Sequence, residues 1–273
     1  MNEARLQRER DELEALSRDG FTRARWIAKT FEYRPQTGST NDDARSAARE
    51  GAAHGHTVLA ERQSSGRGRR GRSWHSPEGS NLYLSVLLRP SLDVADAPLL
   101  ALIAGLAVAH ACDRFVASER VTVKWPNDVR IDRKKVAGIL VEGSIRGDRF
   151  DTAIVGIGLN VHEREWPDEL RDKATCLASH ADAPLSRTAV LAAVLEELER
   201  AVDAMLLGGS SRDGLVRALR SRCDTLGTDV SIDSVHGRAI DLADDGALIV
   251  ERDDHTTVAV RSGEVSAPSS TAQ

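Results

Sequence analysis

Apolar and polar positions alternate in blocks along residues 1–222 and predict helices and strands in turn. Residues 1–20 are densely charged, with Leu6, Leu13 and Leu16 as the main apolar positions, which predicts a short amphipathic helix ended by Gly20. Further helices are predicted at residues 42–50, 99–117, 186–207 (capped by Ser186 or Thr188) and 213–222. Buried strands are predicted at residues 57–61, 81–88, 121–125, 136–142 and 153–161. The mixture of helices and strands predicts an α/β or α+β fold, and the apolar helix at residues 99–117 is expected to pack on a sheet.

Two of these strands are predicted to form a hairpin. The strand at residues 121–125 runs into Pro126-Asn127-Asp128, where proline ends the strand and Asn-Asp favours a turn. After a short polar stretch the chain returns as the strand at residues 136–142. The hairpin would carry Lys124 and Lys135 on its two arms.

The pattern changes after residue 222. Four short strands are predicted at residues 228–232, 237–242, 247–250 and 256–260, with a strong hairpin signal at Asp244-Asp245-Gly246. A module of about 45 residues has little core of its own, so we expect it to dock on the larger domain. The predicted domains are an N-terminal helical arm (1–37), a larger domain (38–222), the small β module (223–267) and a disordered tail (268–273).

The composition is that of an ordinary globular protein, and it bears on the cellular compartment and on the kinds of partner that we expect. Hydrophobic residues make up 41% and charged residues 29%, and the net charge is −5. We expect neither a membrane span, because no run of about 18 apolar residues is seen, nor a signal peptide, because residues 1–5 open a charged segment. Cys112, Cys176 and Cys223 are odd in number and far apart, which favours reduced thiols in the cytoplasm. The acidic balance disfavours general nucleic-acid binding.

An arginine- and glycine-rich loop stands out against this acidic background. Residues 63–72 read Gln-Ser-Ser-Gly-Arg-Gly-Arg-Arg-Gly-Arg, a stretch that follows a predicted strand. Arginine offers paired donors to phosphate and carboxylate oxygens, and glycine allows the backbone close to a ligand. We interpret the stretch as a mobile anion-binding loop. A solvated basic turn and an RNA-binding Arg/Gly segment remain as alternatives.

Other polar residues are candidates for the same site. Ser39-Thr40-Asn41 precede a predicted helix, where their side chains would cap the helix, bind a ligand, or do both. Gly138 inside a predicted strand indicates close approach by a ligand or backbone. Gly156 and Gly158 would leave one face of the next strand open, with Asn160 near its end. Three of the five lysines fall within residues 124–135, where a compact ammonium is expected to be required.

These motifs together resemble the biotin protein ligases. The resemblance covers roughly residues 38–161 and lies in five motifs in the family's order: Ser39-Thr40-Asn41, Gln63 with residues 66–72, Lys124-Trp125-Pro126-Asn127-Asp128, residues 135–140 (Lys-Val-Ala-Gly-Ile-Leu) and residues 156–160 (Gly-Ile-Gly-Leu-Asn). The resemblance implies a mixed sheet flanked by helices, as in class II aminoacyl-tRNA synthetases, with an SH3-like C-terminal β-barrel. Only 38 residues precede Ser39, fewer than the roughly 60 of a helix-turn-helix domain, so we expect a monofunctional ligase without the DNA-binding domain of bifunctional members.

The resemblance also implies a two-step reaction. Biotin and MgATP give biotinyl-5'-AMP and pyrophosphate, and biotin then passes to one lysine of a biotin carboxyl carrier protein domain of a carboxylase. Lys135 and Arg69 are the implied catalytic residues. The implied biotin-binding residues are Ser39, Thr40, Asn41, Gln63, Arg67, Gly68, Arg69, Lys135 and Gly138. The implied ATP- or adenylate-binding residues are Arg67, Arg69, Arg72, Trp74, Lys124, Asn127 and Asn160.

Several interpretations stay open. Asp128 is a candidate for Mg²⁺ or for orienting Lys135, and Trp74 would either stack on adenine or belong to the core. For Lys124, a charge at a strand edge is the alternative. A lipoate ligase, or a nucleic-acid-binding regulator that uses the arginine loop, are the alternative functions. We expect a monomer or weak homodimer with no nucleic-acid or membrane partner.

Overall fold

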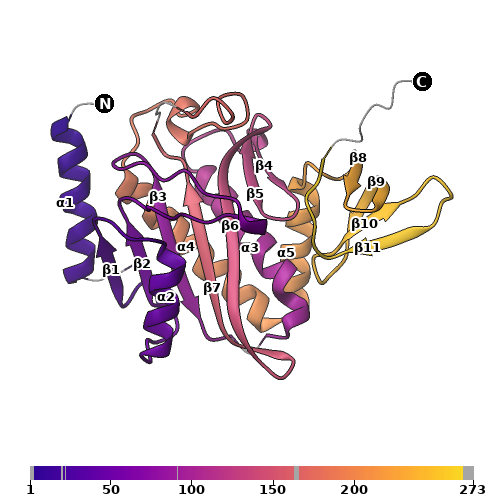
Figure 1. Ribbon diagram of the computed structural model, residues 1–273, viewed down its shortest axis with the longest axis horizontal. Helices are drawn as coiled ribbons and strands as arrows, with labels where there is room; N and C mark the ends of the chain where they lie inside the picture. Colours follow the sequence, from indigo (N-terminus) through magenta and orange to yellow (C-terminus); the bar gives the residue numbers. More distant parts are fainter. Residues whose placement is uncertain (1–2, 20, 22, 91, 163–165, 267–273) are drawn as a thin grey trace.

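The computed structural model describes residues 3–19, 21, 23–90, 92–162 and 166–266. A seven-stranded mixed sheet with helices on both faces forms the larger part of the protein, and a small antiparallel sheet lies at one end (Figure 1). The α/β prediction is confirmed at this level. The predicted stop at Gly20 and the predicted tail at residues 268–273 lie outside the described residues.

The large sheet has the strand order β1-β2-β3-β7-β6-β5-β4. Its strands are β1 (Phe31–Arg34), β2 (Thr57–Ala60), β3 (Leu82–Leu88), β4 (Val121–Lys124), β5 (Asp128–Ile131), β6 (Lys134–Arg146) and β7 (Arg149–Leu159). β1 and β2 are parallel and the other neighbours are antiparallel. Every residue of β3 is buried, as its largely apolar sequence indicates, because both faces of the strand are covered.

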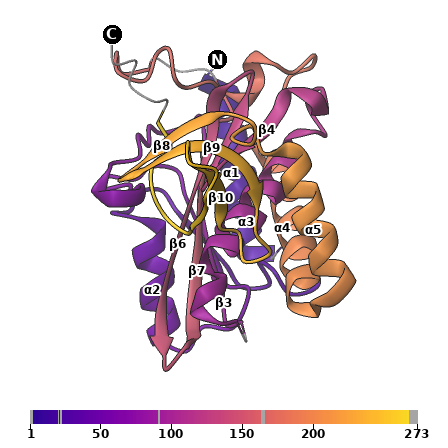
Figure 2. The ribbon, with the colours of Figure 1, turned by 90° about the vertical axis from the view of Figure 1, so that its right-hand side faces the viewer.

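The helices form layers on the two faces of this sheet. They are α1 (Glu3–Asp19), α2 (Thr40–Arg49), α3 (Ala97–Cys112), α4 (Arg187–Leu207) and α5 (Gly209–Arg222), with short 3₁₀ turns η1 (Arg69–Gly71), η2 (Val94–Asp96), η3 (Ser118–Arg120) and η4 (Leu177–Ser179). Figure 2 shows α2 on one face and α3, α4 and α5 on the other. The predicted Ser186 cap is confirmed, since its side chain accepts the Ala189 N–H.

The predicted C-terminal end of α3 was wrong. The helix ends at Cys112 rather than at residue 117, because the chain must return to the sheet and begin β4 at Val121. In the described residues, η2 and α3 together (Val94–Cys112) form one helical segment long and apolar enough to span a membrane. Most of it is buried, against the sheet on one side and α4 on the other, as expected of the core helix of a globular protein.

The predicted two-stranded hairpin was also wrong. An unpredicted strand, β5, begins at Asp128 directly after the turn and pairs with β4 on one side and β6 on the other. Four residues with a single arginine between Val129 and Ile131 give too short a pattern to separate a strand from a loop. Lys124 and Lys135 therefore lie on strands separated by β5. The short edge strand β1 was missed for the same reason.

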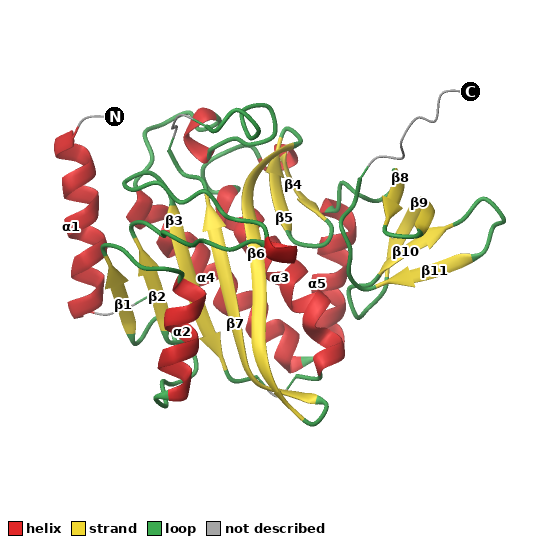
Figure 3. Ribbon diagram, viewed as in Figure 1, coloured by secondary structure: helices red, strands yellow, loops and turns green. Residues whose placement is uncertain are grey.

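The small sheet confirms the four predicted C-terminal strands. β8 (Asp229–Ile232), β9 (Val235–Leu242), β10 (Leu248–Glu251) and β11 (Thr257–Val260) are antiparallel in the order β11-β10-β9-β8 (Figure 3). The module docks as expected: the buried Trp125 indole donates to the Gly246 carbonyl at 3.1 Å. Gly246 also lies so close to Leu99 that a Cβ there would be 2.8 Å from the Leu99 backbone. We refer to residues 223–266 as the C-terminal module.

A buried charge network attaches α1 to the larger domain. Arg187 at the start of α4 is fully buried, and it donates to Glu9 of α1 at 3.0 Å and to Glu61 at 2.9 Å. His162 lies 3.4 Å from the same Glu9 oxygen. Burial raises the pKa of Glu9, but hydrogen bonds and charges from His162 and Arg187 outweigh it and lower the pKa to about 2.

Acid should therefore weaken this attachment. The pKa of Glu9 is lower in the folded protein than in the unfolded chain. Ionised Glu9 therefore contributes its full share to the free energy of unfolding above about pH 4.5, and this share is lost as the pH falls toward 2. At pH 7, Glu9→Gln should lower the free energy of unfolding by about 3 kcal/mol, since the buried Arg187 loses one of its two carboxylate partners. The difference from wild type should shrink in urea titrations at pH 3. Glu12→Gln, on an exposed part of α1, is the control; an unchanged difference at pH 3 would contradict the assignment.

Candidate active site

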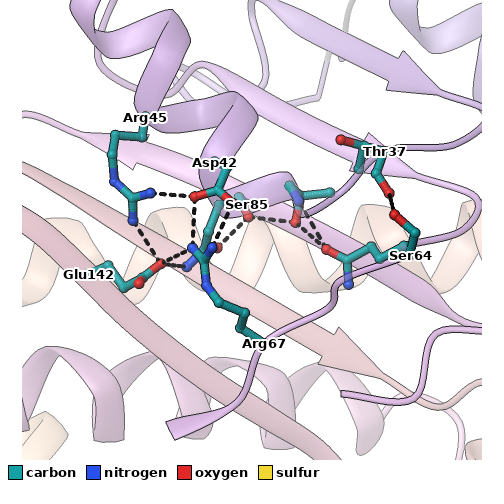
Figure 4. A network of polar contacts seen from close by, with 10 residues as sticks. Thr37, Asp42, Arg45, Ser64, Arg67, Ser85 and Glu142 are labelled. Atoms are coloured by element: carbon teal, nitrogen blue, oxygen red, sulfur yellow. Dashed lines mark hydrogen bonds and ion pairs between the residues drawn. The ribbon is translucent and has the colours of Figure 1, made fainter. Parts of the chain in front are cut away.

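The predicted polar cluster at the start of α2 is present. Ser39, Thr40 and Asn41 are buried. Ser39 is the N-cap residue, but its hydroxyl makes no capping hydrogen bond to the described residues. Gln63 supplies the bond instead: its Oε1 accepts from the Thr40 N–H at 2.9 Å and from the Thr40 hydroxyl at 3.2 Å. Ser85 of β3, which the sequence did not single out, lies 2.6 Å from Asn41 Oδ1 (Figure 4).

Arg67 joins this cluster through two carboxylates. Its Nη atoms lie 2.6 and 2.9 Å from the oxygens of Asp42 on α2, and one lies 3.0 Å from Glu142 on β6 (Figure 4). Arg45 binds the same two carboxylates, and Asn41 Nδ2 donates to Glu142 at 2.7 Å. Hydrogen bonding from Arg67 holds the pKa of Asp42 below its usual value. Sequence reasoning missed Asp42 and Glu142; the available signal was that clustered arginines in an acidic chain need carboxylate partners.

The other loop arginines point toward the C-terminal module. Arg70 and Arg72 form ion pairs with carboxylates of that module. Arg69 differs: its Nη1 lies 3.3 Å from Asn127 Oδ1 and 3.2 Å from the Gly263 carbonyl. Within the described residues, the hydrogen bonds of Arg69 thus go to uncharged oxygens, while its pKa is lowered, first by burial and then by Arg70. A half-buried cation with neutral partners is suited to receive an anionic ligand.

Lys135 is held in place by Asp128 and Trp74. The Nζ of Lys135 lies 2.7 Å from Asp128 Oδ1 on the neighbouring strand β5. The same ammonium stands 5.1 Å from the centre of the Trp74 ring, within range of a cation–π interaction. Asp128 is therefore positioned to orient Lys135, one of its two predicted roles.

Trp74 and Asn41 cover the three glycines that sequence analysis singled out on β6 and β7. A Cβ on Gly158 would lie 2.4 Å from Trp74 Cε2, and one on Gly138 would lie 2.8 Å from Cζ3. On the same face of β7, a Cβ on Gly156 would lie 2.2 Å from Asn41 Oδ1. The Trp74 ring thus lies on the sheet between the Asn41 cluster and Lys135. Its Nε1 is buried and lacks a partner among the described residues.

The remaining predicted site residues, Lys124, Asn127 and Asn160, already make hydrogen bonds within the protein, which leaves them available to a ligand to different extents. Lys124 Nζ lies 3.1 Å from the Val265 carbonyl, and burial, followed by the charge of Arg130, lowers its pKa. Asn127 Nδ2 donates to the Ile139 carbonyl at 2.8 Å, and its Oδ1 faces Arg69. Asn160 is buried, and its Nδ2 donates to the Thr175 carbonyl at 3.1 Å. Asn160 therefore supports the local backbone more than it faces an open space.

A cavity of about 440 Å³ collects most of these groups. The predicted site residues that line it are Arg67, Gly68, Arg69, Arg72, Trp74, Lys124, Asn127, Asp128, Lys135, Gly138 and Asn160. Residues that sequence reasoning missed also line it, namely Arg130, Arg133, Trp166, Lys173 and Glu264. Ser39, Thr40, Asn41 and Gln63 lie outside this lining, on the far side of Trp74. The structure thus gathers the predicted cations in one cavity and places the predicted group of Ser39, Thr40, Asn41 and Gln63 beside it.

Comparison with known proteins agrees with this architecture. Residues 34–160 match the Biotin/lipoate A/B protein ligase family, and residues 231–267 match the biotin protein ligase C-terminal domain. The chain is 31% identical over 269 residues to the bifunctional ligase/repressor BirA of Bacillus subtilis, covering 90% of this chain and 82% of that protein. It is 34% identical over 243 residues to the biotin–[acetyl-CoA-carboxylase] ligase of Mycobacterium tuberculosis, covering 84% and 86%.

Solved structures give the same result. The biotin protein ligase of Aquifex aeolicus in complex with biotin and ATP superposes with a TM-score of 0.73 at 30% identity, covering 87% of this chain and 98% of that one. The chain belongs to the biotin/lipoate A/B protein ligase family, and within that family it is a biotin protein ligase.

The packing of Asn41 on β7 can be tested at Gly156. Gly156→Ala would place a methyl group 2.2 Å from Asn41 Oδ1, which must displace Asn41 and its bond to Glu142. We expect a loss of about 1–3 kcal/mol in stability and a tenfold or greater loss in biotin affinity. Gly105→Ala in α3 is the matched control, because its Cβ would meet neighbours only at 3.7 Å or beyond. Unfolding titrations measure the stability and calorimetry measures the biotin affinity of the two variants. Equal stability and equal affinity in Gly156→Ala and Gly105→Ala would contradict the assignment.

Proposed function

We propose that this protein activates biotin with ATP and attaches it to a carboxylase. The enzyme is a ligase whose substrates are biotin and ATP, with biotinyl-5'-AMP as the intermediate. Its acceptor is a specific lysine of a biotin carboxyl carrier protein domain. The observation that carries the proposal is the cavity in which Lys135, Arg69 and Arg67 meet, in a chain similar to biotin ligases over most of its length.

The first step needs concentrated positive charge. A biotin carboxylate oxygen attacks the α-phosphorus of ATP, a carboxyl–phosphate bond forms, and pyrophosphate leaves. Lys135 lies between the two anions as a point charge, with Asp128 fixing its position. Arg69 binds carboxylate and phosphate oxygens with a guanidinium that pairs with no carboxylate of the described residues. In the second step the carrier lysine amine attacks the biotin carbonyl, an amide forms, and AMP leaves with the anhydride bond broken.

Biotin recognition is assigned to the uncharged groups. Ser39, Thr40, Asn41 and Gln63 provide donors and acceptors for the ureido ring, which needs both when it is buried. Gly138 and Gly68 allow close approach, and Trp74 must move off β7 for a ligand to reach from Lys135 to Asn41. Arg67 then exchanges part of its contact with Asp42 or Glu142 for the ligand. Arg72, Trp74, Lys124, Asn127 and Asn160 are assigned to ATP.

Mg²⁺ is expected to arrive with ATP. Among the described residues, no group of three or more His, Cys, Asp or Glu side chains can hold a metal ion. The residues present still fit this ion, because Mg²⁺ is usually bound by one or two carboxylates together with substrate phosphates. Asp128 is the candidate carboxylate, and the ion would neutralise phosphate charge when bound.

The domain boundaries, the cellular compartment and the oligomeric state are also proposed. The proposed units are an N-terminal arm (1–37), a catalytic domain (38–222) and a C-terminal domain (223–267). The catalytic domain is proposed to be related to class II aminoacyl-tRNA synthetases and the C-terminal domain to be SH3-like. Buried free cysteines accord with the cytoplasm. Nucleic-acid binding is disfavoured because Arg67, Arg70 and Arg72 are paired with carboxylates. A monomer or weak dimer is proposed.

Transfer to the carrier tests this function. The enzyme, biotin and MgATP are incubated with a carrier domain or with the same domain whose acceptor lysine is replaced by arginine. Streptavidin blotting should detect biotin on the first domain alone. Equal labelling of both, or of neither, would contradict a lysine-specific ligase.

A further inference from the structure

The tip of the arginine loop lies against the C-terminal module, more than 160 residues away in sequence. Both Nη atoms of Arg70 contact the carboxylate of Asp233, at 2.8 to 3.1 Å. Arg72 Nη1 lies 2.6 Å from Glu264 Oε1. Between these two ion pairs, Arg69 is placed beside the Gly263 carbonyl and Asn127. The loop therefore crosses the face of the large sheet and reaches the other domain (Figure 1).

The two carboxylates stand on well-supported backbone. Asp233 lies in the tight turn between β8 and β9, and its φ of +51° is a left-handed conformation that aspartate tolerates better than most residues. Glu264 belongs to a segment that pairs with β8 through two hydrogen bonds between Ser231 and Ser266, at 3.0 and 3.1 Å. A Cβ on Gly263, which precedes Glu264, would lie 2.1 Å from the Ile232 side chain, so this segment packs tightly on β8. The module thus presents both charges at fixed positions.

The loop itself is shaped for this contact. Backbone bonds Trp74 N–H to Gly66 O (2.8 Å) and Gly68 N–H to Arg72 O (2.6 Å) close its base. Arg70 at the tip has φ at +55°, a left-handed conformation that a non-glycine residue adopts at a cost in free energy. The bidentate contact with Asp233 offsets that cost and holds the guanidinium away from the cavity.

We propose that Asp233 and Glu264 are positioning residues that hold the arginine loop in the shape that presents Arg69 to the cavity. The C-terminal module thereby controls how readily ATP is bound and the adenylate retained. This inference rests on the proposed function, since it assigns the loop to adenylate formation. The side chains of both ion pairs are 46–58% exposed. Salt therefore screens both pairs, and the loop should be held less firmly at high ionic strength.

The test replaces the two carboxylates by amides of nearly the same size, which removes their charge and preserves the shape of each side chain. Asp233→Asn suits the left-handed backbone because asparagine tolerates it, and Glu264→Gln is isosteric. In the double variant, trypsin cleavage after Arg70 and Arg72, followed by mass spectrometry, should be faster by about threefold to tenfold, within the range for two exposed pairs. The KM for ATP should rise by a similar factor, with kcat at saturating ATP nearly unchanged. Asp254→Asn, in the β10–β11 turn of the same module, is the control.

Salt separates positioning from general destabilisation. Raising NaCl from about 50 mM to 500 mM should accelerate cleavage of the wild-type loop, and much less that of the double variant, whose ion pairs are already removed. A fall in kcat with a lowered melting temperature would instead indicate a merely structural role and overturn the proposal. Equal cleavage and equal KM in wild type and variant would also overturn it. Absence of biotin-dependent turnover in wild type would refute the proposed function, while the cleavage assay would still decide whether the carboxylates hold the loop.

Discussion

Replacing Lys135 by alanine is expected to slow biotinyl-adenylate formation by about 100-fold to 1,000-fold, the usual effect of removing one preorganised electrostatic group. Lys135 lies 2.7 Å from Asp128 and is partly exposed, so its charge is directed into the cavity and does not support the core. The variant should keep its melting temperature within a few degrees. Single-turnover formation of the adenylate, followed by quenching and chromatography, measures the effect.

Two further substitutions define what Lys135 contributes. Lys135→Arg should fail almost as completely, because a planar fork does not replace a compact ammonium between two anions. Lys134→Ala, at the exposed neighbouring position on β6, should behave as wild type. Near-normal turnover by the arginine variant would contradict the point-charge role.

The second large effect is expected at Arg69, on retention of the adenylate. Arg69→Gly removes up to two charge-assisted hydrogen bonds to the intermediate, each worth about 1.5–3 kcal/mol. Adenylate affinity should fall tenfold to several hundredfold, mainly through faster dissociation. Lys135 remains, so activation should continue. The variant should therefore release a reactive mixed anhydride that biotinylates lysines of bystander proteins.

Serum albumin serves as the bystander. Wild type, Arg69→Gly and the exposed control Arg62→Ala are each incubated with biotin, MgATP and albumin, and the albumin is blotted for biotin. Labelling by Arg69→Gly alone supports retention by the loop. A variant that makes no adenylate would mean that Arg69 acts in the chemical step, and the division of roles with Lys135 would be wrong.

Long apolar strands could be predicted from the sequence, whereas the short strands β1 and β5 could not. The strands β3 and β7 were found because each contains a largely apolar run that is buried on both faces, all of β3 and residues 152–157 of β7. The strands β1 and β5 have four residues each, too few for a period to appear. Missing β5 placed Lys124 and Lys135 on adjacent strands, although each lies on a different side of β5.

The candidate site shows the same limit. The cations could be named from the sequence because four arginines in a short glycine-rich loop are unusual in an acidic chain. Their partners Asp42, Glu142, Asp233 and Glu264 could not, because each is an ordinary carboxylate until the fold brings it to an arginine. The position of Trp74 on the glycines of β6 and β7 likewise depends on tertiary packing.

The most direct test of the central claim is ATP–pyrophosphate exchange measured with biotin and, separately, with lipoate as the carboxylic acid. Exchange isolates the activation step and needs no carrier protein. We expect rapid exchange that depends on biotin and Mg²⁺, is lost in Lys135→Ala, and stays near background with lipoate. Exchange supported equally or better by lipoate would contradict the assignment of biotin as the substrate.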